Sequence, residues 1–331
     1  MSTDDPRESS TRVDRSRWTV ALLLVPLALT LASWRGQDRA EELSQLRARG
    51  VLLGARGVAI GALPAIPLHV NESVEHWIEE FQTTRKGEFE ALLERRGLFE
   101  GLITEKLRDR GMPEDLLYLA MIESGLSAVA VSQASAVGLW QFTSATALHL
   151  GLRVDEYVDE RRDPVRATDA ALDYLEWLRA RFGSWYLAAA AYNAGPGRVE
   201  RILHRHADGR TGDEDIYWEV MRYLPRETRD YVPRLIATTI LANDADLLGF
   251  AGTDSDMEAY EFETLFVPGR TSLVTVAESL GVDPGVLLDL NPHLVRGVTP
   301  PGEIYGVRVP IGKIRTVMAY MALGPGAVRA D

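Results

Sequence analysis

One carboxylate stands at the end of an apolar segment: Glu123 closes the stretch Tyr118–Glu123, and Gly125 follows shortly after it. Leu116, Ala120 and Glu123 are spaced i, i+4 and i+7, so in a helix the glutamate lies on the same face as a buried leucine. Burial and the negative end of a helix dipole both disfavour the charged form, which predicts a raised pKa. A carboxyl group that keeps its proton near neutral pH can act as a general acid.

Two downstream segments could complete a site around such an acid. SQASAVGLWQF places polar side chains beside Trp140, a mixture that is typical of sugar binding. In YLAAAAYNAGPG, an alanine-rich helix ends on Tyr192 and Asn193, which would project a phenol and an amide into a neighbouring cavity. Each residue also has a structural explanation: Glu123 could pair with an arginine, the aromatic rings could belong to the core, and Asn193 could cap a helix.

Local signals place these residues on helices. Pro113 begins a helix with acidic residues in its first turn, and Gly125 ends it. Upstream, apolar residues recur at three- and four-residue steps from Val74 to Phe81, which indicates an amphipathic helix. Helical patterns continue to about Leu248, so we expect a mainly α fold there.

The end of the chain has a different pattern, between residues 262 and 313. YEFETLFVP is strand-like, SLVTVAESLG reads as a short helix stopped by Gly281, and DPGVLLDLNP opens a second helix with Asp283 as its cap. IYGVRVP then alternates with a period of two, as a strand does. This order predicts a small α+β module with a βααβ arrangement.

Composition narrows the class of partner. The chain has 331 residues, 46% hydrophobic and 25% charged, enough for one sizeable core and a small second module. Its formal net charge of −12 disfavours nucleic acid, so an uncharged substrate or a polymer held by neutral contacts fits better. There is no cysteine, which excludes thiolate chemistry. His204 and His206 split a helix face, and Ala259 stands where a calcium loop needs glycine, so no metal or cofactor is predicted.

The N-terminal segment predicts a route out of the cytoplasm. After a cytoplasmic segment at residues 1–17, Trp18–Trp34 is a run of 17 uncharged residues, the lower limit for crossing a bilayer. Its flanking tryptophans favour an uncleaved membrane anchor, whereas the small residues at 30–32 keep a cleaved signal peptide open. A buried core helix is the least favoured interpretation. Residues 35–65 are then expected to be a linker.

The motifs together resemble the catalytic domain of the soluble-type lytic transglycosylases, glycoside hydrolase family 23. The matching segments, in order, are ES at Glu123, AVGLWQF, ALDYLEWLRARFGSWYLAAAAYNAGPGRV and LPRETRDYVP. RRDP at Arg161–Pro164 and PRETRDYVPR at Pro225–Arg234 further resemble the membrane-bound lytic murein transglycosylase D branch. The resemblance covers residues 66–250, with a core at about 108–205, and implies a lysozyme-like helical fold.

The resemblance also implies roles for individual residues. Glu123 matches the family's catalytic glutamate. The residues that match substrate-binding positions are Ser132, Gly138, Gln141, Tyr192, Asn193 and Glu227. Two departures bear on the loop after Glu123 and on substrate fit: Ser135 stands where the family usually has glycine, and Leu126–Ala128 where it has FNP.

The implied reaction cleaves peptidoglycan without water. Protonated Glu123 would donate to the glycosidic oxygen between N-acetylmuramic acid and N-acetylglucosamine. The resemblance supplies no second carboxylate as nucleophile, so the substrate's N-acetyl group would assist, with Tyr192 stabilising the developing charge. Glu123 would then accept the proton of the C6 hydroxyl, which closes a 1,6-anhydro ring. The expected location is the periplasmic side of the cell envelope, anchored to the membrane.

Other functions stay open at this point. A hydrolytic muramidase on the same fold would release products heavier by one water, and a non-catalytic wall-binding scaffold would cleave nothing. The segment from Gly269 to Pro292 resembles the LysM pattern of modules that bind N-acetylglucosamine polymers, although Arg270 replaces the usual aspartate. Glycan binding and a purely structural cap both fit this module. Residues 314–331 are expected to form a tail.

Overall fold

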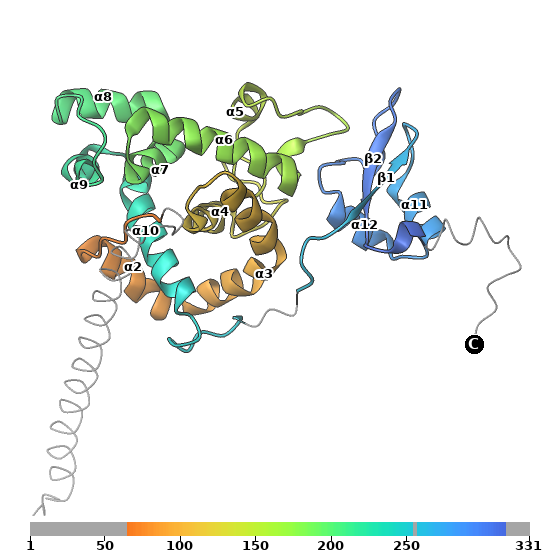
Figure 1. Cartoon of the computed structure of the whole chain (residues 1–331), viewed down its shortest axis with the longest axis horizontal. Coiled ribbons are helices and arrows are strands. Elements are labelled where there is room, and N and C mark those ends of the chain that lie inside the picture. Colours follow the sequence, from red (N-terminus) through yellow and green to blue (C-terminus); the bar gives the residue numbers. More distant parts are fainter. Residues whose placement is uncertain (1–64, 254–256, 316–331) are drawn as a thin grey trace, which may run out of the picture. The chain divides into compact units, whose positions relative to one another are not determined.

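A computed structural model describes residues 65–253 and 257–315 (Figure 1). The predicted anchor or signal peptide at 18–34, almost all of the linker, and the tail from residue 316 lie outside the described residues. Within the described ranges, no helix is both long enough and apolar enough to cross a bilayer.

Helices build the larger part of the described chain. They are, in chain order, α2 (Glu72–Gln82), α3 (Lys86–Asp109), α4 (Leu117–Ser124), α5 (Ser144–His149), α6 (Pro164–Phe182), α7 (Trp185–Ala194), α8 (Pro196–His206), α9 (Asp215–Val220) and α10 (Arg226–Asn243). Single 3₁₀ turns at Glu114–Leu116, Glu160–Arg162 and Met221–Tyr223 precede α4, α6 and α10. The short helix α4 packs against both α3 and α10, among the surrounding helices (Figure 1). The predicted mainly α class is confirmed.

Local chemistry explains where several of these helices begin and end. The side chain of Asn71 accepts hydrogen bonds from the backbone N–H groups of Ser73 and Val74, which caps α2. Gly125 ends α4 in the left-handed conformation, with φ of 63°, as the sequence predicts. The carboxylate of Glu214 accepts from the N–H groups of the first two residues of α7, each at 2.8 Å. The alanines of α7 are buried, so neighbouring helices can approach it closely.

The segment between α4 and α5 is not helical. Short antiparallel bridges join Val131 to Val137 and Val137 to Phe142, which folds the loop back on itself. Gly138 lies within it at φ of 82°, and an added Cβ would come 1.8 Å from the carbonyl oxygen of Arg161. Only glycine fits this close approach. The loop is therefore fixed against the RRDP segment that precedes α6.

The C-terminal module has the predicted βααβ order: β1 (Glu263–Val267), α11 (Leu273–Leu280), α12 (Pro284–Leu290) and β2 (Tyr305–Val309). The two strands pair antiparallel, with Leu265 opposite Val307. Asp283 caps α12 through its side chain, as the sequence predicts. The module's small core also includes Val158, which comes from the loop before α6. The module thus packs on a segment of the helical part.

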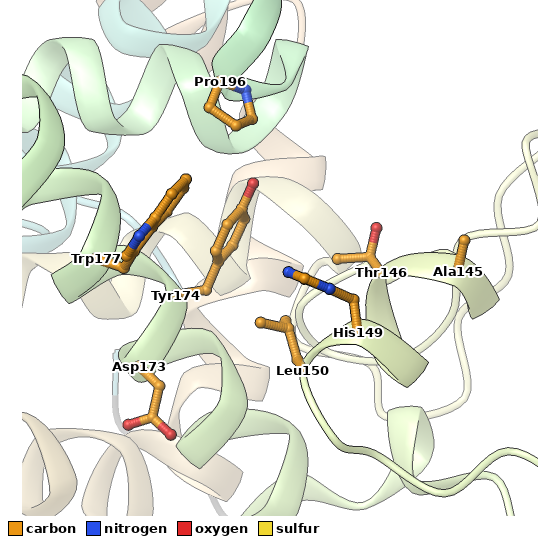
Figure 2. Close-up of a pocket in the computed structure, with 8 residues that line it drawn as sticks. All are labelled: Ala145, Thr146, His149, Leu150, Asp173, Tyr174, Trp177 and Pro196. Carbon is orange, nitrogen blue, oxygen red and sulfur yellow. The ribbon is translucent and has the colours of Figure 1, made fainter.

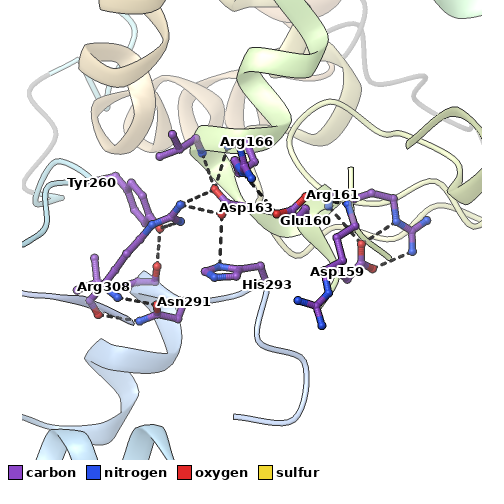
Figure 3. A network of polar contacts seen from close by, with 12 residues as sticks. Asp159, Glu160, Arg161, Asp163, Arg166, Tyr260, Asn291, His293 and Arg308 are labelled. Carbon is purple, nitrogen blue, oxygen red and sulfur yellow. Dashed lines mark hydrogen bonds and ion pairs between the residues drawn. The ribbon is translucent and has the colours of Figure 1, made fainter. Parts of the chain in front are cut away.

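A buried ion pair reinforces this contact (Figure 3). Asp163 caps α6 by accepting hydrogen bonds from the N–H groups of Val165 and Arg166, at 2.9 and 3.0 Å. Nη2 of Arg308, on β2, donates to both carboxylate oxygens of Asp163 at 2.7 Å. The other terminal nitrogen of Arg308 donates to the hydroxyl oxygen of Tyr260 at 2.8 Å. Because these groups satisfy one another, the strand and the start of α6 are held together.

Candidate active site

Glu123 lies in the last turn of α4 and is only partly exposed. Leu116 and Ala120, the residues that share its face by spacing, are buried. The hydroxyl of Tyr231, on α10, donates a hydrogen bond to Oε1 of Glu123 at 2.7 Å. Among the described residues no salt bridge joins Glu123 to a basic side chain, so the arginine pairing considered above is not what seats it.

The surroundings of Glu123 favour its protonated form. Burial raises the pKa of Glu123 to about 7. The hydrogen bond from Tyr231 and the positive charge of Arg234 act in the opposite direction, while the negative charge of Glu227 adds to the rise. Burial is the largest of these effects. A carboxyl group with this pKa can both donate and accept a proton near neutral pH.

Sequence reasoning missed Tyr231, although its spacing contains the signal. Glu227, Tyr231 and Arg234 follow one another at i, i+4 and i+7 on α10, and all three act electrostatically on Glu123. This is the same spacing that places Leu116, Ala120 and Glu123 on one face of the preceding segment. Two helix faces with equal spacing therefore meet at the carboxyl group.

Tyr192 and Asn193 lie at the end of α7, each with a defined partner. The hydroxyl of Tyr192 donates to the backbone carbonyl of Trp140 at 2.7 Å, and burial raises its pKa well above the usual range. Tyr192 is therefore a neutral phenol close enough to Glu123 to feel its charge. Asn193 donates to the carboxylate of Glu227 at 3.2 Å and accepts from the hydroxyl of Thr228 at 2.7 Å. These hydrogen bonds hold the C-terminal end of α7 against the start of α10, close to Glu123.

Ser132, Gly138 and Gln141 share the loop between α4 and α5. Ser132 is exposed, and its hydroxyl accepts from the N–H of Ala136 at 3.1 Å. The side-chain amide of Gln141 donates to the carbonyl of Gly138 at 2.8 Å. These bonds shape the loop itself, and in the described structure none of the three residues hydrogen-bonds to Glu123. Their contact with a substrate remains a prediction.

Two sequence features of this loop have a physical explanation. Ser135 adopts φ of 59°, a left-handed conformation that glycine takes at lower cost, which explains why glycine is the usual residue of the family at this position. Trp140 is fully buried, and its indole N–H donates to the hydroxyl of Thr168 at 3.0 Å. Its ring therefore belongs to the core and is not a sugar platform.

Two cavities lie near these residues. One, of about 300 Å³, is lined by Glu123 together with parts of α2, α3 and α10. The other, of about 550 Å³, lies between α5, α6 and the start of α8 (Figure 2), and none of the predicted site residues lines it. This second cavity is linked to the site through Tyr174 in its wall, whose ring centroid lies 5.7 Å from that of Tyr192. On the other side, the ring of Tyr174 stacks with Trp177. Among the described residues, no three His, Asp or Glu side chains are grouped so that they could hold a metal ion.

Two stretches of the chain match known family models. Residues 101–213 match the transglycosylase SLT domain. This stretch is similar to an SLT domain. Residues 261–323 match the LysM-like domain of the lytic transglycosylase MltD, so the LysM resemblance of the C-terminal module is also confirmed. Glu123, Tyr192 and Asn193 fall inside the SLT match, whereas Glu227 and Tyr231 lie beyond its end.

Individual proteins are also similar to this chain. Membrane-bound lytic murein transglycosylase D of Escherichia coli K12 is 31% identical over 191 residues, which covers 57% of this chain and 41% of that protein. Peptidoglycan transglycosylase gp16 of Escherichia phage T7 is 40% identical over 104 residues, covering 30% of this chain and 8% of that protein. The chain thus spans less than half the length of either. Among solved structures, the soluble lytic transglycosylase SLT70 of Escherichia coli matches over 54% of this chain and 29% of its own, with 26% identity and a TM-score of 0.39.

Proposed function

We propose that this chain is a peptidoglycan lytic transglycosylase in which Glu123 acts first as acid and then as base. The observation that supports it best is the seat of Glu123: the carboxyl group is mostly buried, forms no described salt bridge, and has a pKa of about 7. One group must both give and take a proton in this reaction, and a pKa near the working pH suits both steps. The names of the relatives, which include murein and peptidoglycan transglycosylases, support the same substrate.

In the first step, protonated Glu123 donates to the glycosidic oxygen between N-acetylmuramic acid and N-acetylglucosamine. Positive charge develops at the sugar, and the N-acetyl group of the substrate is proposed to assist, since the resemblance supplies no carboxylate nucleophile. Tyr192, a neutral phenol near Glu123, would stabilise this charge. Ser132, Gly138, Gln141, Asn193 and Glu227 are proposed to bind the glycan.

In the second step, ionised Glu123 accepts the proton of the C6 hydroxyl, and the oxygen closes a 1,6-anhydro ring. Tyr231 supports this step, because its hydroxyl donates to the carboxylate at 2.7 Å and stabilises the ionised form. No water enters the products.

The C-terminal module and the N-terminal segment are both consistent with an enzyme that acts on the cell wall. We propose that the LysM-like module holds glycan strands, and that the N-terminal segment delivers the enzyme to the cell envelope, attached to the membrane on its periplasmic side. The relative of Escherichia coli is named as membrane-bound. A pull-down of the chain with insoluble peptidoglycan, with and without residues 262–313, tests the binding role.

Digestion of purified murein sacculi tests the catalytic proposal. Glu123→Gln should reduce turnover by about 10²–10⁴-fold, the range expected for loss of a general acid. Glu105→Gln, an exposed residue on α3, serves as the matched control and should keep full activity. Mass spectrometry of the products should show 1,6-anhydro ends. Products heavier by one water would instead identify a hydrolase, and undiminished digestion by Glu123→Gln would refute the role of this residue.

A further inference from the structure

The cavity beside Glu123 is unexpectedly basic for so acidic a chain. Three arginines line it: Arg85 from the turn between α2 and α3, Arg95 from α3, and Arg234 from α10. The sequence as a whole carries a formal net charge of −12, which gave no reason to expect an anion site. A local group of guanidinium ions next to a proposed general acid calls for a chemical explanation.

One of the three arginines is already neutralised. Arg85 forms a double hydrogen bond with the carboxylate of Glu88, one of them from Nε at 2.8 Å, and Glu88 also lines the cavity. The charges of these two side chains cancel. They therefore contribute no net attraction for a ligand.

Arg95 and Arg234 have donors that the described protein leaves unused. Nε of Arg95 donates to the carbonyl of Ala91 at 3.1 Å, and its two terminal nitrogens have neither a hydrogen bond nor a salt bridge in the described residues. Nη2 of Arg234 donates to the carbonyl of Ile122 at 3.1 Å, while its Nε is buried without a hydrogen-bond partner and its guanidinium group lies 5.6 Å from the ring centroid of Trp77. Arg95 is half-buried, so its free terminal nitrogens are the donors open to an anionic ligand in the cavity, and the positive charge of Arg234 would add to the attraction.

We propose that Arg95 and Arg234 form an anion subsite that binds a carboxylate of the peptide stem carried by peptidoglycan. This inference rests on the proposed function and assigns the peptide stem of the substrate to the cavity beside Glu123. A cavity of about 300 Å³ has room for a carboxylate and its neighbouring atoms. The planar guanidinium group matches a carboxylate by two parallel hydrogen bonds.

The position of the subsite fits the attachment of the stem. In peptidoglycan the peptide is linked to N-acetylmuramic acid, the sugar whose glycosidic bond Glu123 is proposed to protonate, so a stem carboxylate is delivered close to the acid. A bound carboxylate would also offset the positive charge of Arg234, which otherwise favours the ionised form of Glu123. Substrate binding would then help Glu123 to keep its proton until the first step.

The test compares two forms of the same substrate. Murein sacculi are used either untreated or after their stem carboxylates are converted to amides with carbodiimide and ammonia. For the native protein, kcat/KM should be about tenfold to a hundredfold higher on untreated sacculi, the effect of one charge-assisted hydrogen bond. In Arg95→Gln the ratio of kcat/KM on untreated sacculi to kcat/KM on amidated sacculi should fall to about one, mainly because KM for the untreated sacculi rises.

Two further variants sharpen the result. Arg95→Lys keeps the charge and should retain part of the ratio, whereas Arg205→Gln, an exposed arginine on α8, should retain all of it. If the native protein digests both substrates equally well, or if Arg95→Gln keeps the native ratio, the anion subsite is wrong while the proposed activity stands. If the native protein releases no anhydro products from either substrate, the proposed function and the subsite both fail.

Discussion

Glu123 and Asp163 are two largely buried acidic side chains that differ in their hydrogen-bond and ion-pair partners. The comparison shows that these partners determine how burial affects a carboxyl group. Asp163 accepts hydrogen bonds from two backbone N–H groups of α6, and both its oxygens accept from Arg308 (Figure 3). Glu123 has one described hydrogen bond, from the neutral hydroxyl of Tyr231, and no salt bridge. The site of Asp163 supplies the full positive charge of Arg308, whereas the hydrogen-bond donor at Glu123 is neutral.

The difference separates a structural carboxylate from a reactive one. Asp163 is paired with Arg308, and this buried ion pair joins the C-terminal module to the helical part. His293 lies near this pair, with its Nδ1 at 3.7 Å from Asp163, but burial lowers its pKa to about 4, so the imidazole stays neutral. At Glu123 the charge is only partly compensated, so the proton is held near neutral pH and remains available for transfer.

Breaking the matched pair should have the largest effect on stability. Arg308→Met would leave the Asp163 carboxylate buried without its cation, so we expect a loss of about 3–5 kcal/mol in the free energy of unfolding. Equilibrium urea denaturation measures it. The control is Arg296→Met, which removes the exposed ion pair of Arg296 with Glu156 at 2.8 Å between the same two parts and should cost less than about 1 kcal/mol. Similar losses in both variants would show that Asp163 needs no buried partner.

Glu123, which has no ion-pair partner in the described structure, should make the fold less stable as pH rises. Most acidic residues, whose pKa is lowered on folding, have the opposite effect. Folding raises the pKa of Glu123 from its ordinary value of 4.5 to about 7, so its protonated form stabilises the fold below pH 4.5, and that contribution is lost as pH rises towards 7. Glu123→Gln removes this dependence. Relative to the native protein, the variant should gain about 3 kcal/mol in unfolding free energy between pH 4 and pH 8.

Denaturation curves of both proteins across this pH range provide the measurement. The control is Glu105→Gln, whose exposed side chain should leave the pH dependence of the native protein unchanged. Parallel curves for Glu123→Gln and the native protein would mean that the carboxyl group titrates normally, and the contrast with Asp163 would disappear.

Sequence alone could predict the features that depend on local spacing. The helix that ends at Gly125, the apolar face under Glu123, and the βααβ order of the C-terminal module follow from periodicity and capping residues, which act within a few residues of each other. The glycine at position 138 was identified by resemblance, and the structure supplies its reason in the close approach of a carbonyl.

Features that depend on distant contacts could not be predicted. Arg308 occupies an ordinary position in a short strand, and only the arrival of Asp163, 145 residues earlier in the chain, makes it a buried ion-pair partner. Trp140 stands among polar residues in the sequence but is in the core. The cavity beside Glu123 brings together three arginines from three separate segments, although the whole chain carries a net negative charge. The net charge of a whole chain does not show where side chains of the opposite charge gather in the fold.

The smallest effect tests the single hydrogen bond that distinguishes the seat of Glu123. Tyr231→Phe removes a donor that favours the ionised carboxylate, so the pKa of Glu123 should rise above about 7. Because the first step needs the protonated acid, the basic limb of the pH profile of kcat/KM should move up by about one pH unit. The matched control is Tyr118→Phe, which removes a buried hydroxyl that donates to Asn243 at an equal distance of 2.7 Å. Both variants should lose comparable stability, but only Tyr231→Phe should move the limb, and a downward or absent shift would show that Tyr231 does not govern the proton on Glu123.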